Sequence, residues 1–398
     1  MGNCAACEDT QEFDQNTEVN LQKKKRIQEN FQNMEKEQYD ENEFGKENVF
    51  QNKETEKVKR SGKHDDYQSL AGSRVDQLNS STKKERLNPL SASKGFQNGQ
   101  QQSVNSNRQS ANKLDETGDH IPPHLNKLDQ LPDFSNEFTR EVLEKLGEFV
   151  YDQDEEESFL DLPFFGPCEM ENNAFYIGQW KHGQRWGRGK QVWSDGSQYE
   201  GYWKNDMANG KGRLIHADGD VFEGNWLNDK AHGKGVYIHR DGASYSGDWF
   251  EDKQHGFGVE KWIDGASYEG NYFMGMKHGH GVFTWADGSI YKGEFQNNNI
   301  DGRGSYKWAD GREYDGTWRD NKMHGKGVFT WKDGRKYIGE YIDDKKHGLG
   351  EFYWPDGRVY KGYWENGKQH GRGFYKGSNG REREGEWKEG KKIRWLDE

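Results

Sequence analysis

Cysteine, proline and long apolar stretches are all scarce in this sequence. Among 398 residues there are 3 cysteines and 7 prolines. Three cysteines are too few for a disulfide framework, so we expect an intracellular protein. No run of about 18 apolar residues occurs, so no transmembrane helix is predicted. The N-terminus lacks the apolar core of a signal peptide, and no secretory signal is expected.

Motifs that mark common enzyme classes are missing as well. The sequence contains no GxxxxGKS/T phosphate-binding loop, no kinase catalytic loop or DFG motif, and no GxSxG nucleophile turn. No segment outside the repeats described below is long and apolar enough to form a catalytic domain. We therefore predict a protein that is not an enzyme and that uses no cofactor.

Charge and aromatic residues are distributed unevenly. The formal net charge is −12, and the acidic excess lies within residues 1–174, whereas all 15 tryptophans follow that point. A near-neutral C-terminal part on an acidic chain lacks the positive field that nucleic-acid binding requires. Residues 8–133 are rich in Gln, Asn, Ser and charge, and they cannot bury enough apolar surface to offset chain entropy. We predict a disordered tether there.

The most informative feature that is present is a 23-residue period without insertions. Nine full units begin at Tyr176, Tyr199, Phe222, Tyr245, Tyr268, Tyr291, Tyr314, Tyr337 and Tyr360, and a truncated tenth begins at Arg383. A fixed period of this length is the signature of a stacked array, in which each unit buries its apolar side chains against its neighbours. Such arrays mostly bind other molecules and rarely catalyse reactions.

The seventh unit illustrates how each repeat is expected to fold. Tyr314, Gly316 and Trp318 alternate along the chain and so share one face of a strand, and the glycine leaves room for the flanking rings. After a polar loop, Phe329 and Trp331 mark a second strand. An Asp-Gly pair then supplies the turn to the next unit. Each unit is therefore predicted to be one antiparallel β-hairpin.

A glycine recurs at the third position of every unit and is assigned to this packing role. The nine full units place it at Gly178, Gly201, Gly224, Gly247, Gly270, Gly293, Gly316, Gly339 and Gly362. Two strands advance roughly 10 Å, and right-handed twist accumulates over many strands. The predicted fold is all-β: an elongated single-layer array of antiparallel hairpins at 174–398, preceded by the disordered region and one short amphipathic helix.

The pattern Tyr-x-Gly-x-Trp, followed by His-Gly-x-Gly and Asp-Gly, resembles the MORN repeat family over residues 176–390. Three units depart from it, with Trp186, Asn209 and Asp301 in place of His. The resemblance implies a scaffold of the kind found in membrane junctions, in cortical cytoskeleton and in ciliary radial spokes. It also implies that homodimers can form through the C-terminal repeats.

The recurring histidines are not predicted to bind metal. They are His232, His255, His278, His324, His347 and His370. Neighbouring copies would lie roughly 10 Å apart, whereas zinc ligands converge to within about 2.0 to 2.1 Å of one ion. The Asp residues of the Asp-Gly pairs are not predicted to bind calcium, because copies in neighbouring repeats would be equally far apart. We expect loop histidines that bond to nearby backbone.

The N-terminal sequence MGNCAAC, residues 1–7, predicts acylation. Gly2 matches the start of an N-myristoylation signal, and Cys4 and Cys7 lie within reach of a membrane-held palmitoyltransferase. The usual signal has Ser or Thr where this chain has Ala6, and an incidental start to the polar tail is the alternative. One myristoyl chain binds a bilayer with only about 10⁴ M⁻¹, so palmitoylation would be needed for stable attachment.

Two sets of basic residues are candidates for contact with anionic lipid or protein. The first is Lys23, Lys24, Lys25 and Arg26, and the second, in the seventh unit, includes Arg319, Lys322 and Lys326. Each such cation can contribute about 1 kcal/mol near an anionic membrane. The alternative for both sets is a solvated run of charge.

Residues 134–173 are predicted to hold a helix and a linker that cap the array. Phe138, Val142 and Leu146 follow at helical spacing, with Ser135 as the N-cap. The helix would cover the open edge of the first hairpin, and LDLPFF at 160–165 would continue that cover. Docking of a partner on the helix is the alternative.

The favoured hypothesis is a non-catalytic peripheral membrane scaffold. Acyl chains would hold it at the cytoplasmic face of a plasma membrane or cell cortex, and the array would bind cytoskeletal or cortical protein or a second membrane. One alternative is an axonemal subunit similar to the MORN proteins of radial spoke heads. Another is a regulatory subunit of a phosphoinositide kinase, with an array that senses phospholipid directly.

Overall fold

The computed structural model describes residues 122, 125–152, 161–170 and 173–396. These residues form one helix and 21 strands, and the strands belong to one open antiparallel sheet, so the predicted fold class is confirmed. The chain divides into two compact units between Val221 and Phe222. In the described part of the chain, no helix has the length and apolar character needed to cross a bilayer.

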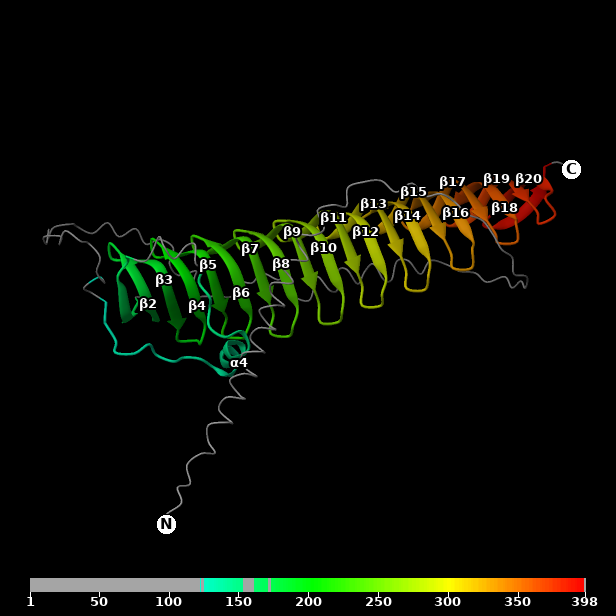
Figure 1. Ribbon diagram of the computed structural model, residues 1–398. Helices are drawn as coiled ribbons and strands as arrows, with labels where there is room; N and C mark the ends of the chain where they lie inside the picture. Colours follow the sequence, from blue (N-terminus) through cyan, green and yellow to red (C-terminus); the bar gives the residue numbers. More distant parts are fainter. Residues whose placement is uncertain (1–121, 123–124, 153–160, 171–172, 397–398) are drawn as a thin grey trace, which may run out of the picture. The chain divides into compact units, whose positions relative to one another are not determined.

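The first unit contains the helix and the first five strands, and each of these strands pairs antiparallel with the next (Figure 1). Its elements are α4 (Glu137–Leu146), β1 (Phe164–Glu169), β2 (Ala174–Lys181), β3 (Gln184–Trp193), β4 (Gln198–Lys204) and β5 (Met207–Ile215). Asn136 caps α4: its side chain accepts hydrogen bonds from the backbone of Phe138 and Thr139. The prediction of Ser135 as the N-cap is therefore wrong by one residue, because the Ser135 hydroxyl bonds Asp133 instead.

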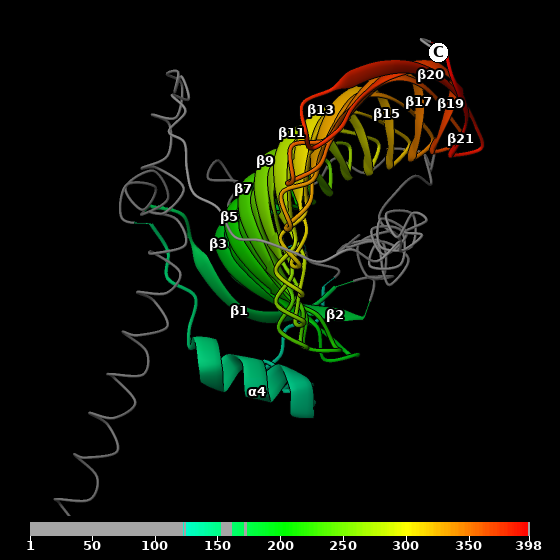
Figure 2. The same ribbon diagram turned by 90° about the vertical axis from the view of Figure 1, so that its right-hand side faces the viewer.

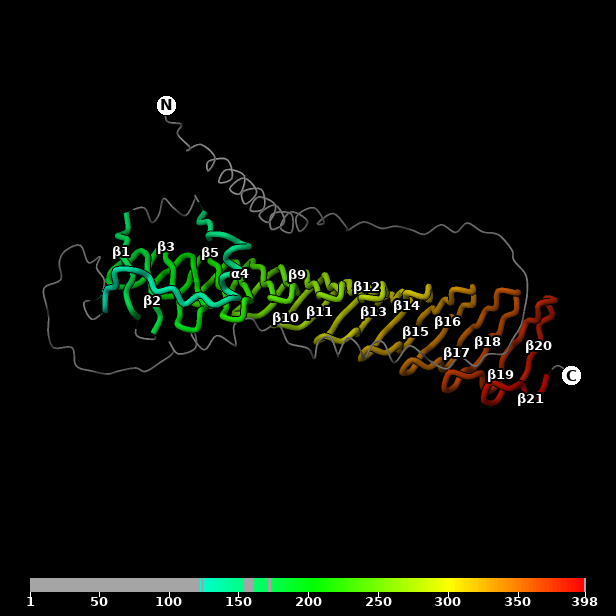
Figure 3. Tube along the Cα trace, turned by 90° about the horizontal axis from the view of Figure 1, so that it is seen from below, coloured from blue at the N-terminus to red at the C-terminus, as the bar shows by residue number. Residues whose placement is uncertain are grey.

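The second unit is a row of strands in chain order (Figure 3). Its strands are β6 (Val221–Leu227), β7 (Lys230–Ile238), β8 (Ser244–Phe250), β9 (Lys253–Lys261), β10 (Ser267–Phe273), β11 (Met276–Thr284), β12 (Ile290–Gln296), β13 (Asn299–Lys307), β14 (Glu313–Arg319), β15 (Lys322–Thr330), β16 (Lys336–Ile342), β17 (Lys345–Tyr353), β18 (Val359–Glu365), β19 (Lys368–Lys376), β20 (Glu382–Lys388) and β21 (Lys391–Trp395). Figure 2 shows the strand direction turning steadily from β7 to β21, as sheet twist requires.

Two kinds of turn join the strands. Within the seventh repeat, Asp320 (φ 47°) and Asn321 (φ 66°) form a two-residue turn between β14 and β15, which is the conformation that suits a tight hairpin. Between repeats, Gly334 has a φ of 87°, and the Asp333 side chain accepts a hydrogen bond from the backbone of Arg335 at 3.1 Å. The Asp-Gly turn is thus present, while the predicted polar loop is shorter than expected.

The short turn changes the place of the recurring histidines. His232, His255, His278, His324 and the two later copies lie within strands β7 to β19, so the prediction of loop histidines is wrong. Because only two residues form the turn, the strand begins two residues before each histidine. Backbone bonding occurs at His255, whose Nδ1 accepts from the Met274 amide at 3.4 Å.

The core is made by aromatic rings laid over pairs of glycines. Gly316 and Gly327 face each other across β14 and β15, and a Cβ on Gly316 would come within 2.5 Å of the Tyr314 hydroxyl and 2.6 Å of the Gly327 Cα. Tyr314 is fully buried and meets Trp318 edge to face at 5.1 Å. The Trp318 indole donates to the carbonyl of Gly304 at 3.1 Å, which ties one repeat to the preceding one.

The open edge of the first hairpin is covered by a strand. β1 pairs with β2, from Phe164 opposite Gln179 to Glu169 opposite Phe175. Part of the predicted LDLPFF segment therefore does protect the edge, but the helix does not, and that prediction is wrong. Main-chain pairing satisfies the edge groups directly, which leaves the helix free to pack on a face of the sheet.

Candidate functional site

The two faces of the sheet differ in kind. In β14, Tyr314 and Trp318 point to one side, and the residues between them, Asp315 and Thr317, point to the other. We call the first side the aromatic face and the second the variable face. The variable face carries the second, fourth, thirteenth and fifteenth residues of each repeat, and Lys326 is the thirteenth residue of repeat seven. These residues change from repeat to repeat, so the variable face is the one that can distinguish partners.

In the first unit, the variable face is covered by the segment that follows α4. The Tyr202 hydroxyl donates to the backbone carbonyl of Asp152 at 3.1 Å, and the ring meets that of Tyr151 edge to face at 5.3 Å. The guanidinium of Arg188 lies 5.1 Å from the centre of the Tyr151 ring. Tyr202 is only 1% exposed as a result. Tyr202 and Arg188 of this face thus both contact an extended stretch of polypeptide.

Cations of the same face complete the binding of this segment. Lys211 Nζ lies 2.7 Å from Asp152 Oδ2. Arg213 donates to the carbonyl of Gly147 at 2.8 Å, and its guanidinium lies 5.7 Å from the centre of the Phe149 ring. The side chains of this face therefore contact backbone carbonyls, aromatic rings and a carboxylate. Any extended segment with aromatic and acidic residues offers these same groups.

In the second unit, the variable face carries large apolar side chains that no described segment covers. They are Phe257, Ile338, Leu349, Tyr363 and Phe374, with exposures from 37% to 56%. Leu349 and Tyr363 are directly opposite each other on β17 and β18. Ile338, Leu349, Tyr363 and Phe374 lie on the neighbouring strands β16 to β19, whereas Phe257 lies apart on β9. A group of exposed apolar side chains on neighbouring strands is typical of an interaction surface.

A second apolar feature follows the hairpin turns of repeats three to five. Five rings alternate in one row, with successive centroids 5.2 to 5.9 Å apart and successive ring planes tilted by 44° to 50°: His232, Phe250, His255, Phe273 and His278. Phe250 and Phe273 are 40% and 53% exposed. This row of rings was not predicted from the sequence. Phenylalanine occupies the sixth position of only two repeats, so no recurring pattern pointed to histidine–phenylalanine contacts.

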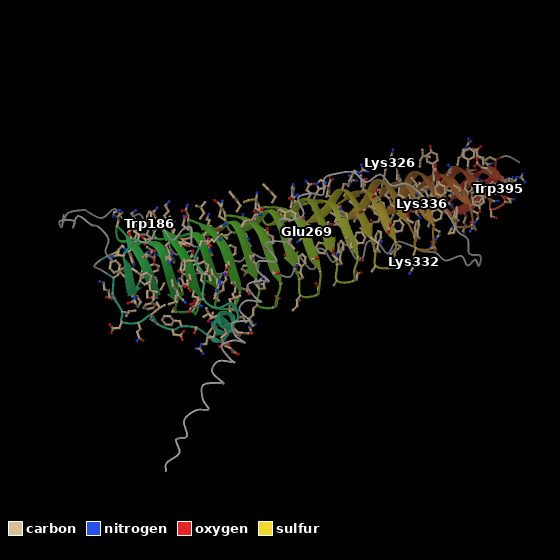
Figure 4. All side chains as sticks on the ribbon, in the orientation of Figure 1. Trp186, Glu269, Lys326, Lys332, Lys336 and Trp395 are labelled. Carbon is tan, nitrogen blue, oxygen red and sulfur yellow. The ribbon has the colours of Figure 1, made fainter. Side chains whose placement is uncertain are left out.

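The predicted cations of repeat seven are exposed, and most lack an acidic partner. Lys322, Lys326, Lys332 and Lys336 form no ion pair within the part of the chain that the structure describes. The guanidinium of Arg319 contacts the His324 ring at 3.0 Å, so it is less available. Figure 4 shows Lys326, Lys336 and Lys332 spread across the width of the sheet.

The aromatic face holds a buried ion pair in repeat five. Lys277 Nζ lies 2.8 Å from Glu260 Oε2, and the Tyr272 hydroxyl donates to the same oxygen at 2.8 Å. The lysine ammonium also lies 4.9 Å from the centre of the Trp262 ring. Lys277 and Glu260 are 3% and 6% exposed. Each buried charge is therefore stabilised by its partner and not by water.

Repeat eight has a lysine at the same position without a carboxylate. Lys346 Nζ lies 5.0 to 5.3 Å from the ring centres of Trp331, Tyr337, Phe352 and Trp364. Among the described residues it has no ion pair. Burial, together with the smaller effect of the charge on Arg335, lowers the pKa of Lys346 to about 8. The rings stabilise the cation only in part.

One group of side chains has metal-ligand types in close approach. Glu365, His370 and Glu389 each offer an atom, and these atoms lie within 4.8 Å of one another. Glu365 and His370 belong to the ninth repeat and Glu389 belongs to the tenth. Only residues at the same position of different repeats were compared in the sequence, so this group was not predicted. His370 Nδ1 lies 3.1 Å from Glu365, and Lys368 lies 3.4 Å from Glu389. A cation, Lys368, therefore already stands beside one of the two carboxylates of this group.

The predicted acylation residues Gly2, Cys4 and Cys7 and the basic run Lys23, Lys24, Lys25 and Arg26 lie outside the described residues. The third cysteine, Cys168, is buried in β1 with a free thiol. Burial raises the pKa of that thiol to about 11, so Cys168 is unreactive.

A sheet of repeated hairpins, with one face packed and one face that varies, defines a repeat scaffold. Nine consecutive segments match the MORN repeat: residues 176–198, 199–221, 222–244, 245–267, 268–290, 291–311, 314–334, 337–357 and 360–380. The chain belongs to the MORN repeat family. Proteins of this family are generally non-catalytic scaffolds.

No curated protein matches the chain, but solved structures show distant similarity. The TCP10 domain of Danio rerio CPAP in complex with a STIL peptide is 16% identical, with a TM-score of 0.32, over 53% of this chain and 94% of that one. The TCP domain of Drosophila melanogaster SAS-4 with a proline-rich motif of Ana2 is 13% identical, with a TM-score of 0.26, over 39% and 84%. At these scores the similarity carries no conclusion about partners.

Proposed function

We propose that this protein is a non-catalytic scaffold that binds polypeptide segments on the variable face of its sheet. The observation that supports this function is the binding of residues 147–152 in the first unit, where Tyr202, Lys211 and Arg213 recognise a carbonyl, a carboxylate and an aromatic ring. In the second unit, no part of the chain that the structure describes covers the same face. Cytoskeletal or cortical proteins are the partner class that we favour.

We further propose that acyl chains at Gly2, Cys4 and Cys7 hold this scaffold at the cytoplasmic face of a membrane. Myristate alone gives marginal binding, and palmitate adds roughly 0.8 kcal/mol per buried methylene. The order of the chain supports this arrangement, because a long polar segment separates the acylation residues from the array and would let the array reach a partner away from the bilayer.

Metabolic labelling with myristate and palmitate analogues, combined with membrane fractionation, tests the anchor. Gly2→Ala is expected to lose both labels and move to the soluble fraction, and the Cys4→Ala/Cys7→Ala pair should lose palmitate alone and bind membranes weakly. Cys168→Ala is the matched control, because this thiol is buried, and it should label as the wild type does. If Gly2→Ala carries no label and its localisation is the same as that of the wild type, the acyl anchor is ruled out and the axonemal alternative is favoured.

Direct lipid sensing by the array is a second candidate function. Four exposed lysines of repeat seven without acidic partners among the described residues support it, since unpaired cations attract anionic headgroups. This role would fit a regulatory subunit of a phosphoinositide kinase, and its test is given with the predictions below.

A further inference from the structure

Repeats two and nine share an unusual residue. At the fourth position of the repeat, only these two units have tyrosine, as Tyr202 and Tyr363. Tyr202 is 1% exposed because residues 151 and 152 of the chain cover it, whereas Tyr363 is 53% exposed and no described segment lies on it. The fourth position of the repeat is therefore covered by polypeptide in repeat two, and in repeat nine it is not covered by any segment that the structure describes.

The cation that accompanies this tyrosine is also repeated. Lys211, which binds the Asp152 carboxylate, is the thirteenth residue of repeat two, and Arg372 is the thirteenth residue of repeat nine. In both repeats the glycine next to the tyrosine pairs with the glycine next to the cation: Gly201 with Gly212, and Gly362 with Gly373. Arg372 is exposed and forms no ion pair within the described part of the chain.

The surroundings of the two tyrosines differ in a way that favours apolar contact at repeat nine. Where the first unit has Arg188 and Arg213, the later repeats have Leu349 and Phe374, which are 56% and 48% exposed. Leu349 lies directly opposite Tyr363. A ligand at repeat nine would contact a more apolar surface than the segment bound in the first unit does, with Arg372 as the cation of the site.

We propose that the variable face of repeats eight and nine is a docking site for an extended segment of a partner protein that carries an aromatic residue followed by Asp or Glu. The Tyr363 hydroxyl donates to a backbone carbonyl of that segment, its ring packs on the partner's aromatic ring, and Arg372 binds the carboxylate. Leu349 and Phe374 flank the aromatic ring. The site rests on the proposed scaffold function and specifies the chemistry of its partner.

A peptide with the sequence of residues 145–152, KLGEFVYD, provides the probe, because it contains the segment that repeat two already binds. Its binding to the full chain, measured by fluorescence anisotropy, should weaken by at least about tenfold in Tyr363→Ala, as for a central aromatic contact. Arg372→Gln should weaken it by about threefold to tenfold. A peptide in which the final Asp is replaced by Asn should bind Arg372→Gln and the wild type with the same affinity.

The matched control is Arg303→Gln, which removes an exposed thirteenth-position cation from a repeat with Glu294 at its fourth position. This variant should bind the peptide as the wild type does. Absence of peptide binding, or binding unaffected by Tyr363→Ala and by Arg372→Gln, overturns the site.

Two further outcomes would overturn the assignment of the occupant. If binding is lost in Tyr202→Ala but kept in Tyr363→Ala, the peptide displaces the chain's own segment, and the site at repeat nine is excluded while the scaffold function stands. If sedimentation shows a dimer that Tyr363→Ala dissociates, the occupant is a second copy of this chain. Acylation plays no part in these measurements, so they are independent of the membrane anchor.

Discussion

Lys277 and Lys346 occupy the same position of the repeat, and only Lys277 has a carboxylate partner. Its Nζ lies 2.8 Å from Glu260, whereas Lys346 is enclosed by four aromatic rings with no ion pair to any described residue. The reason is one residue in the preceding repeat: the position of Glu260 in repeat four is taken by Phe329 in repeat seven. Opposite effects on stability follow.

Replacing Lys346 with Met should stabilise the protein at neutral pH. The folded state lowers the pKa of Lys346 to about 8 from 10.5, so the unfolded state binds more protons between these values and stability rises with pH through that window. Lys346→Met should add about 1–2 kcal/mol below pH 8 and flatten the pH dependence above it. Met323 occupies this position in repeat seven, so the methionine fits. Urea unfolding at pH 7 and pH 9.5 measures both effects, and a destabilised variant at pH 7 would contradict the account.

Replacing Lys277 with Met should instead destabilise the protein by about 3–5 kcal/mol at pH 7, because the Glu260 carboxylate remains buried without its cation. The double variant Lys277→Met/Glu260→Leu should recover most of the loss, since repeat two has Leu214 at the position of Glu260. The same unfolding measurement applies. A double variant as unstable as the single one would show that the charge is not the cause.

Gly316→Val should disrupt the seventh repeat. A Cβ there would lie 2.5 Å from the Tyr314 hydroxyl and 2.6 Å from the Gly327 Cα, and backbone cannot move aside cheaply, so we expect a loss of about 2–3 kcal/mol. The control is Gly166→Ala in β1, where no atom lies within 4 Å of the added Cβ. An unchanged melting curve for Gly316→Val would refute the packing of rings over glycine pairs.

The lysines of repeat seven should bind anionic vesicles if the array senses lipid. The background is a full chain with Gly2→Ala, Cys4→Ala and Cys7→Ala, which cannot be acylated. Exchanging Lys326, Lys332 and Lys336 for Gln should weaken binding to phosphoinositide vesicles by about tenfold or more.

The matched control exchanges three ion-paired lysines, Lys234, Lys307 and Lys361, which already have acidic partners at 2.9, 3.1 and 3.2 Å. This control should bind vesicles nearly as the background does. If the background chain does not bind such vesicles at all, lipid sensing by the array is excluded.

The sequence was sufficient to predict the hairpin array because its signals are local. Tyr314, Gly316 and Trp318 define a strand by their spacing, and Asp-Gly defines the turn. The histidines were misplaced because the turn at Asp320 and Asn321 is shorter than a polar stretch suggests. Recognition of residues 147–152 by Tyr202 and Arg213 was not predictable, because the contacts join residues 50 or more positions apart and no spacing rule connects them.

Limited trypsin digestion tests most directly whether the variable face binds polypeptide. Arg140 and Lys145 are cleavage sites in α4, and the adjoining segment is held by Tyr202 and Arg213. Two lost hydrogen bonds, at about 1 kcal/mol each, should raise cleavage of Tyr202→Phe/Arg213→Gln at these sites by about tenfold or more, while cleavage within β14 to β19 stays unchanged. Cleavage at Arg140 and Lys145 at the wild-type rate would contradict the claim that this face binds the segment.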